Sequence, residues 1–182
     1  MNPQQTTKIS RFLSLVLRHQ PETIGITLAE DGWTNVDELI AAMNKHGQHL
    51  DFETLELVVE TNDKKRFAFS DDGEMIRANQ GHSVEVNLGY QPTPPPEILY
   101  HGTVARFLPS IREGGIQKGQ RHQVHLSVSL DVANTVGKRR GQPVILTVRA
   151  REMNVAGHDF YISTNGVWLT DFVPAAFIDF EE

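Results

Sequence analysis

The feature that most constrains the fold of this 182-residue chain is the proline-rich segment QPTPPPE at 91–97, which holds four of the nine prolines. Proline has a restricted φ and no backbone N–H, so such a run favours an extended, semi-rigid connector over helix or sheet. A chain of this length can form one good-sized domain or two small ones. The segment therefore predicts two lobes, 1–90 and 98–182, joined by a linker at 91–97.

The first predicted lobe shows helical patterns followed by a hairpin pattern. Apolar residues recur at helical spacing in three windows: 9–17, 36–43 and 52–59. Pro21 ends the first pattern, just after Arg18 and His19. In RFAFSDDGEMIRA, the Asp72-Gly73 pair predicts a tight turn between two short strands, because this pair tolerates positive φ angles. Three helices and a hairpin indicate a winged helix-turn-helix lobe.

The second predicted lobe mixes short strands with helices. Strand-like runs occur at four places: 98–102, 123–128, 143–150 and 166–170. Helical stretches lie near 104–113 and 130–138, and Gly114-Gly115 is expected to end the first of them, since glycine permits a left-handed turn. The whole chain is therefore predicted to be α+β.

The amino-acid composition limits the cellular compartment and the kinds of functional site that are expected for this chain. The chain has no cysteine, which excludes disulfides, thiolate zinc sites and cysteine nucleophiles and fits a reducing compartment. No apolar run approaches the roughly 20 residues that span a bilayer, and the first residues show no signal-peptide pattern. We therefore expect a cytoplasmic protein with no membrane partner.

The charge distribution limits the kind of nucleic-acid site that the chain can hold. The net charge is −6, and residues 1–90 carry 8 Lys/Arg against 14 Asp/Glu, whereas residues 91–182 carry 9 of each. An acidic lobe rarely grips a long duplex, but a few placed arginines can still recognise a few phosphates. Any RNA site should be small and local.

Four cationic or titratable residues are candidates for phosphate chemistry: Arg18, His19, Arg66 and Arg139. Taken singly, each has a simpler explanation as a helix-end or loop charge. Taken together, they supply forked donors and an imidazole, which phosphate recognition and transfer require.

Two further histidines have small or hydroxylated neighbours. His101 begins His-Gly-Thr and His125 begins His-Leu-Ser, and we expect both at strand ends, where ligand-binding groups collect. His122 and His125 make a poor metal pair, because residues three apart on a strand face opposite ways and no cysteine or nearby carboxylate completes the set. Neither GxGxxG nor a P-loop is present, so a Rossmann or P-loop mode of nucleotide binding is not supported.

Eight ordered motifs across both lobes resemble the RNA 2′-phosphotransferase family. They are SRFLSLVLRHQPE (10–22), DGW (31–33), TNDKKRF (61–67), IRANQGHS (76–83), LYHGT (99–103), VHLS (124–127), GKRRGQPVILTV (137–148) and NGVWLT (165–170). The resemblance implies a winged-helix RNA lobe followed by an ADP-ribosyltransferase-like NAD⁺ lobe, in agreement with the proposed boundary.

The resemblance also implies roles for the candidate residues. Arg18, His19, Arg66 and Arg139 match a phosphate-handling tetrad, with Arg139 preferred to Arg140 because the family arginine stands two residues before the glycine. The implied NAD⁺ site comprises His101, Gly102, Thr103, His125, Ser127 and Val167. Gly81 and His82 match a motif that we assign only to the neighbourhood of the substrate cleft.

Val167 stands where many protein-modifying ADP-ribosyltransferases have a glutamate. A phosphate nucleophile is already ionised at neutral pH, so it needs no carboxylate to activate it. The resemblance thus implies a two-step reaction in which the RNA 2′-phosphate first displaces nicotinamide from NAD⁺. The 2″-hydroxyl of the attached ADP-ribose then attacks phosphorus, which yields 2′-OH RNA and ADP-ribose 1″,2″-cyclic phosphate.

Two alternatives remain at this point. One is a one-step ADP-ribosyltransferase that modifies a protein or a nucleic-acid phosphate, whose product would keep the ADP-ribose. The other is a non-enzymatic winged-helix nucleic-acid-binding regulator, which should carry a basic face and bind duplex with a steep salt dependence. For the phosphotransferase we expect no divalent metal, because the arginines supply positive charge.

Overall fold

The computed structural model describes residues 3–180, which form two compact units that meet in the chain between Gly89 and Tyr90. The proline-rich segment 91–97 has no helix or strand. It is fastened to the second unit, since the Thr93 N–H donates to the Phe160 carbonyl at 2.7 Å and the Arg151 N–H donates to the Glu97 carbonyl at 3.2 Å. The segment is thus part of the second unit.

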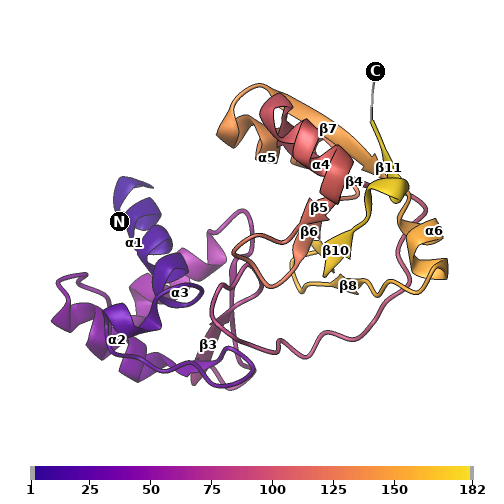
Figure 1. The fold of residues 1–182 in the computed structure, drawn as a ribbon. Helices are drawn as coiled ribbons and strands as arrows, with labels where there is room; N and C mark the ends of the chain where they lie inside the picture. The colour runs from indigo at the N-terminus through magenta and orange to yellow at the C-terminus, as the bar shows by residue number, and fades with distance from the viewer. Residues whose placement is uncertain (1–2, 181–182) are drawn as a thin grey trace. The chain divides into compact units, whose positions relative to one another are not determined.

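The first unit contains three α-helices (Figure 1): α1 (Pro3–Val16), α2 (Val36–Lys45) and α3 (Phe52–Glu60), with a 3-10 turn at Pro21–Thr23. All three predicted helices are confirmed. Asn35 and Asp51 cap α2 and α3, because their side-chain oxygens accept from the N–H groups of Glu38 and Thr54.

A three-stranded antiparallel sheet completes the first unit in the order β1-β3-β2, formed by β1 (Thr34–Asn35), β2 (Phe67–Phe69) and β3 (Met75–Ala78). The predicted hairpin is confirmed, and Gly73 has the positive φ, 76°, that its turn requires. Strand β1 was not predicted, because a strand of two residues is too short to show an alternation of apolar and polar residues. Fully buried side chains from all three helices, from the turn after α1 and from β3 form the core: Leu13, Leu17, Leu39, Met43, Leu55 and Ile76.

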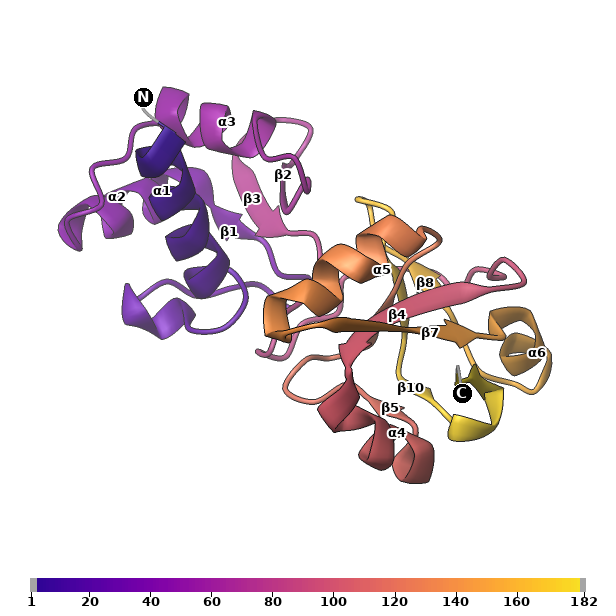
Figure 2. The ribbon, with the colours of Figure 1, turned by 90° about the horizontal axis from the view of Figure 1, so that it is seen from above.

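The second unit is built around a sheet in the order β11-β7-β4, in which β4 (Leu99–Val104) and β7 (Pro143–Val148) pair along six residues and β11 (Ile178–Asp179) borders β7. Helix α5 (Leu130–Gly137) packs across β4 and β7 (Figure 2). The approach is close because β4 has a glycine at the crossing: a Cβ on Gly102 would lie 1.8 Å from the Ala133 carbonyl oxygen.

A second small sheet has the order β6-β9-β8 and is formed by β6 (Val124–Leu126), β8 (Tyr161–Ile162) and β9 (Trp168–Thr170). A backbone bridge between Tyr100 of β4 and Ser127, the residue after β6, connects this sheet to the first one. The other elements are a β5–β10 pair (Ile116–Gln117 and Phe172–Val173), α4 (Leu108–Gly114), α6 (Ala150–Val155) and 3-10 turns at Ala105–Phe107, Lys138–Arg140 and Ala175–Phe177. Gly115 ends α4 with φ 70°, as expected.

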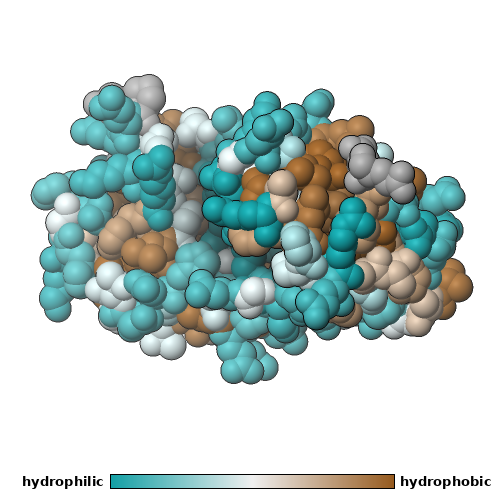
Figure 3. Space-filling view, turned by 45° about the horizontal axis from the view of Figure 1, so that its top comes forward, coloured by the Kyte–Doolittle hydropathy of each residue, from teal (hydrophilic) through white to brown (hydrophobic). Residues whose placement is uncertain are grey.

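The fold is α+β, as predicted, with some strand boundaries corrected. The strand expected at 143–150 ends at Val148, because Ala150 already starts α6 and is fully buried there. The strand expected at 123–128 covers only 124–126. Hydrophilic residues cover much of the face shown in Figure 3, with apolar areas between them. Within residues 3–180, no helix combines the length and apolar character needed to cross a membrane.

Candidate functional site

Arg18 and His19 lie in the turn that follows α1. The N–H groups of Ser83 and Val84 donate to the Arg18 carbonyl oxygen at 2.8 and 3.3 Å, which ties this turn to the segment after β3. The Ser83 hydroxyl lies 2.9 Å from Nδ1 of His19. The exposed imidazole is therefore oriented by a hydroxyl that sequence reasoning did not single out, although Ser83 belongs to the IRANQGHS motif.

Arg66 is held by two buried asparagines at the start of the hairpin. Its backbone N–H and its guanidinium both donate to Asn62 Oδ1, at 3.3 and 3.4 Å, and the Asn62 amide donates to Ser10 Oγ of α1 at 3.0 Å. On the other side, the Asn79 amide donates to the carbonyl of Lys65, a residue with a positive φ of 43°. The uncharged amides of the two asparagines thus position Arg66 and do not cancel its positive charge.

Arg18 and Arg66 are neighbours in the first unit. The Arg18 guanidinium donates to the Arg66 carbonyl at 3.4 Å and lies 5.9 Å from the centre of the Phe67 ring. The structure therefore gathers three predicted residues, two arginines and His19. Two guanidinium groups and an imidazole can together bind a phosphate dianion through charge-assisted hydrogen bonds.

Gly81 and His82 stand beside this group in the chain but have a different environment. His82 exposes only 2% of its surface, and its ring packs near Gly32, where an added Cβ would lie 3.5 Å from Nε2. Gly81 has a φ of 87°. This buried position favours a supporting role, in which the segment carries Ser83 to His19.

In the second unit, His101 and His125 lie side by side. Their expected position at strand ends is wrong: each lies inside its strand, β4 or β6, because both strands extend beyond the histidine. The His101 Nδ1 lies 3.2 Å from the His125 carbonyl oxygen. Since a carbonyl only accepts, this Nδ1 carries the proton and Nε2 of a neutral His101 has a free lone pair.

Arg121 is the functional candidate that sequence reasoning missed. Its guanidinium lies 3.1 Å from Nδ1 of His125, and because a guanidinium only donates, the His125 proton must be on Nε2. Its position four residues before His125, between two recognised motifs, was the only signal in the sequence.

Positive charge is concentrated around these side chains. Burial lowers the pKa of the Arg121 guanidinium, and the charges of Arg140 and Arg139 lower it further. Burial is also the main cause that lowers the pKa of His101, with Arg140 and Arg121 adding to it against the opposing effect of the His125 carbonyl. A neutral imidazole and a group of arginines can bind an anion next to a hydroxyl-bearing ligand.

Arg139 and Arg140 lie in the 3-10 turn that follows α5, and both are exposed. The Arg140 guanidinium lies 5.8 Å from the centre of the Phe107 ring. Of the three arginines, Arg121 alone has a hydrogen bond to a predicted NAD⁺-site residue among the bonds recorded for residues 3–180.

The remaining predicted NAD⁺-site residues have mixed environments. Gly102 is required by the packing of α5, and Thr103 is buried. Ser127 pairs with Tyr100 through two backbone hydrogen bonds, and its hydroxyl accepts from the Ser129 N–H at 3.0 Å. Continuing the β6–β9 register by one residue places Val167 opposite Ser127. This apolar residue thus borders the strand that carries His125.

The donor set of the second unit fits NAD⁺ by its chemistry. Guanidinium groups match a pyrophosphate, and the His101 Nε2 lone pair and the Ser127 hydroxyl match ribose hydroxyls. By contrast, residues 3–180 contain no group of three His, Asp or Glu side chains that could hold a metal ion.

Comparison with known proteins gives a consistent result. Residues 4–172 match the model of a family described as RNA 2′-phosphotransferase, Tpt1/KptA family. The chain is 53% identical over 181 residues to a probable RNA 2′-phosphotransferase of Flavobacterium johnsoniae, covering 100% of both chains. It is 56% identical to proteins of the same description from Burkholderia lata, over 94% of this chain and 89% of the other, and from Pseudomonas aeruginosa, over 93% of each.

Proposed function

Because this chain belongs to the RNA 2′-phosphotransferase family, we propose that it removes an internal 2′-phosphate from RNA by transferring it to the ADP-ribose part of NAD⁺. The products would be 2′-OH RNA, nicotinamide and ADP-ribose 1″,2″-cyclic phosphate. The observation that carries the proposal is the full-length similarity to the family, and the gathering of Arg18, His19 and Arg66 supports it.

The proposal assigns RNA recognition to the first unit and NAD⁺ binding to the second. Three helices followed by a β-hairpin support a winged-helix character for residues 3–89. Two small antiparallel sheets bridged at Tyr100 and Ser127, with histidines on the bridged strands, support an ADP-ribosyltransferase-like character for residues 90–180.

In the first step the 2′-phosphate attacks the nicotinamide-bearing carbon of NAD⁺, and nicotinamide leaves. His101, Gly102, Thr103, His125 and Ser127 would hold the nucleotide for this step. His101 contributes a neutral Nε2 that accepts a hydroxyl proton in a hydrogen bond, and His125 contributes an Nε2–H donor. Val167 supplies no charge, which suits a nucleophile that is already an anion.

In the second step the 2″-hydroxyl of the attached ADP-ribose loses its proton and attacks phosphorus, and the bond from phosphorus to the RNA 2′-oxygen breaks. Charge builds on the non-bridging oxygens of the phosphate, and the guanidinium groups of Arg18 and Arg66 would stabilise it. The leaving 2′-oxygen needs a proton, and His19 is the titratable group that stands with these arginines. The Ser83 hydroxyl orients that imidazole for the transfer.

The family motif adds one cation of the second unit to the residues that the proposal assigns to phosphate. The sequence motif favours Arg139. Arg121 and Arg139 are both exposed, but Arg121 has the contact with His125, so the geometry within the second unit favours Arg121. We therefore include Arg121 beside Arg139 and make their comparison a test. These cations take the electrostatic role that Mg²⁺ has in most phosphoryl transfer, so the proposed reaction needs no divalent metal. A cytoplasmic location, suggested by the absence of cysteine, is part of the proposal.

The test is incubation of a 2′-phosphorylated oligoribonucleotide with NAD⁺ in the presence of a chelator, with nicotinamide release measured. We expect release that depends on the 2′-phosphate and persists in the chelator. An RNA product that retains ADP-ribose at the end of the reaction would instead identify a one-step ADP-ribosyltransferase. No release with any 2′-phosphorylated RNA would overturn the proposal.

A further inference from the structure

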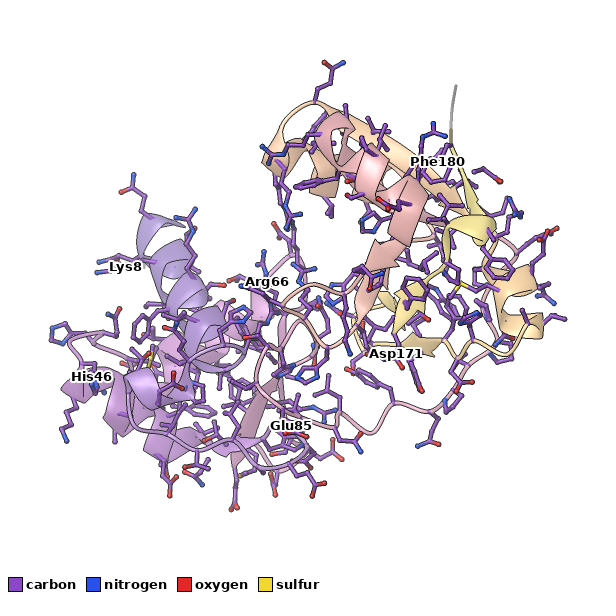
Figure 4. The ribbon with its side chains drawn as sticks, viewed as in Figure 1. Lys8, His46, Arg66, Glu85, Asp171 and Phe180 are labelled. Carbon is purple, nitrogen blue, oxygen red and sulfur yellow. The ribbon has the colours of Figure 1, made fainter. Side chains whose placement is uncertain are left out.

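The outer face of α1 forms one side of an open groove of about 610 Å³ in the first unit. Its walls are Gln4, Thr7, Lys8, Arg11, Phe12, Leu15 and Gln48. Lys8 and Arg11 are exposed, whereas Phe12 is half-buried and packs against the core of the unit. In Figure 4 the Lys8 side chain extends away from α1. The groove thus combines two exposed cations with an aromatic ring.

The charge of this groove contrasts with that of the rest of its unit. Residues 1–20 contain three Lys/Arg and no Asp or Glu, whereas residues 21–90 contain five Lys/Arg and 14 Asp/Glu. Among the ion pairs recorded for residues 3–180, none involves Lys8 or Arg11. A basic strip therefore lies on an otherwise acidic unit, and its charge is available to an anionic partner.

The strip leads toward the phosphate-handling residues. Lys8, Arg11 and Arg18 are spaced by three and seven residues, which places them near one line along α1 and the turn after it. With a rise of about 1.5 Å per residue, Arg11 and Lys8 stand roughly 10 and 15 Å before Arg18 along the helix axis. This separation corresponds to a few nucleotides of an RNA strand.

We propose that the α1 groove binds the single-stranded RNA that flanks the 2′-phosphorylated nucleotide. This inference rests on the proposed function, which puts the 2′-phosphate at Arg18, His19 and Arg66. Lys8 and Arg11 contact backbone phosphates, and the exposed part of Phe12 packs against a base, a combination that binds single strands without sequence preference. The groove thus extends the site at Arg18, His19 and Arg66 along a single RNA strand. The acidic residues around the groove disfavour the binding of a duplex.

An acidic protein segment is the competing occupant, since it too would satisfy two cations. The continuity of the strip with Arg18 favours RNA, because the strand is covalently attached to the phosphate bound there. A peptide would gain nothing from this continuity.

The experiment compares a 2′-phosphorylated dinucleotide with a dodecamer phosphorylated at a central nucleotide, using the full chain. The variant is Lys8→Ala/Arg11→Ala, and Lys45→Ala/Arg151→Ala is the matched control, because it removes two exposed positive charges that do not line the groove. Phe12→Leu removes the ring but keeps an apolar side chain against the core. Binding of the dodecamer without NAD⁺ is measured over a range of salt concentrations.

We expect Lys8→Ala/Arg11→Ala to raise KM and Kd for the dodecamer roughly tenfold, and to lower the slope of log K against log salt by about 1.4, the value for two phosphate contacts on a single strand. The rise in KM should be much smaller for the dinucleotide. The control should behave like wild type, and Phe12→Leu should weaken dodecamer binding with an unchanged salt slope.

Equal KM, Kd and salt slope for the groove variant and the control would overturn the inference while wild-type turnover still supports the proposed function. Binding of a polyglutamate peptide that depends on Lys8 and Arg11, with RNA affinity unchanged, would also overturn it. Failure of wild type to act on either RNA would instead count against the proposed function.

Discussion

The two units hold their functional cations in different ways. In the first unit, Arg66 is positioned by the neutral amide of Asn62, and His19 is oriented by the Ser83 hydroxyl. In the second unit, desolvation lowers the pKa of the Arg121 guanidinium, and the nearby charges of Arg140 and Arg139 lower it further. The first arrangement favours precise placement of a few donors, whereas the second favours a strong local positive potential. On this comparison, the proposed mechanism assigns proton transfer to the first unit and divides charge stabilisation between the two units.

The largest effect should come from His19→Ala. Loss of a general acid costs on the order of 100-fold or more, and only the second step needs a proton on the leaving 2′-oxygen. A time course with labelled 2′-phosphorylated RNA should therefore show a persistent ADP-ribosylated species. Ser83→Ala keeps the imidazole and should show a smaller defect of the same kind. Equal slowing of both steps, without the intermediate, would mean that His19 mainly binds substrate.

The next effect tests which arginine of the second unit acts on phosphate. Arg121→Ala should slow the second step roughly 100-fold, as expected for removal of a preorganised donor. Arg139→Ala removes the same charge from an exposed turn and serves as the matched comparison, with an expected change of about threefold or less. Single-turnover rates for both variants decide the point. A larger loss in Arg139→Ala would restore the assignment made from the motif.

A third prediction concerns stability instead of chemistry. Gly102→Ala should destabilise the second unit by about 3 kcal/mol, because the new Cβ would overlap the Ala133 carbonyl and force α5 away from β4. Gly114→Ala is the control, since its Cβ would have only an ordinary contact at 4.0 Å. Chemical denaturation measures both. If Gly102→Ala left the denaturation midpoint unchanged but abolished NAD⁺ binding, the glycine would be required for ligand binding and not for packing.

The smallest effect is a pH dependence of stability. The folded pKa of His101 is below its usual value near 6.5, so the unfolded chain binds the proton more readily. The contribution of His101 to the free energy of unfolding is therefore fully present above about pH 6.5. It is lost as the pH falls through the folded pKa of His101. Thermal unfolding between pH 5 and 8 should show a decrease in Tm below pH 6.5 that His101→Asn reduces. Identical pH profiles would exclude this contribution.

The sequence predicted long elements better than short ones. α1, α2 and α3 were recognisable because each repeats an apolar face over several turns, and the hairpin because Asp72-Gly73 marks its turn. Strands of two residues, such as β1 and β5, contain no period to detect. The end of β7 was misplaced because Arg149 and Ala150 suit a strand or a helix, and packing decides between them.

Within the candidate site, motif resemblance identified residues but not their supports. Asn62 and Arg66 are only four residues apart, but no motif marks Asn62 as the partner of Arg66, and nothing local in the sequence connects Ser83 with His19 across 64 positions. Arg121 was missed because it lies between motifs; its bond to His125 spans only four residues, whereas the contact of His125 with His101 depends on the bridge between β4 and the end of β6. The contacts of His19 with Ser83 and of His101 with His125 depend on tertiary structure and cannot be read from spacing alone.

The most direct test of the account is the fate of a labelled 2′-phosphate. RNA carrying a radioactive phosphorus at one internal 2′-position is incubated with NAD⁺ and the full chain, and all labelled products are identified. The account predicts that the label passes through an ADP-ribosylated RNA and ends in ADP-ribose 1″,2″-cyclic phosphate. Label released as inorganic phosphate, or label that remains on RNA bearing ADP-ribose, would contradict it.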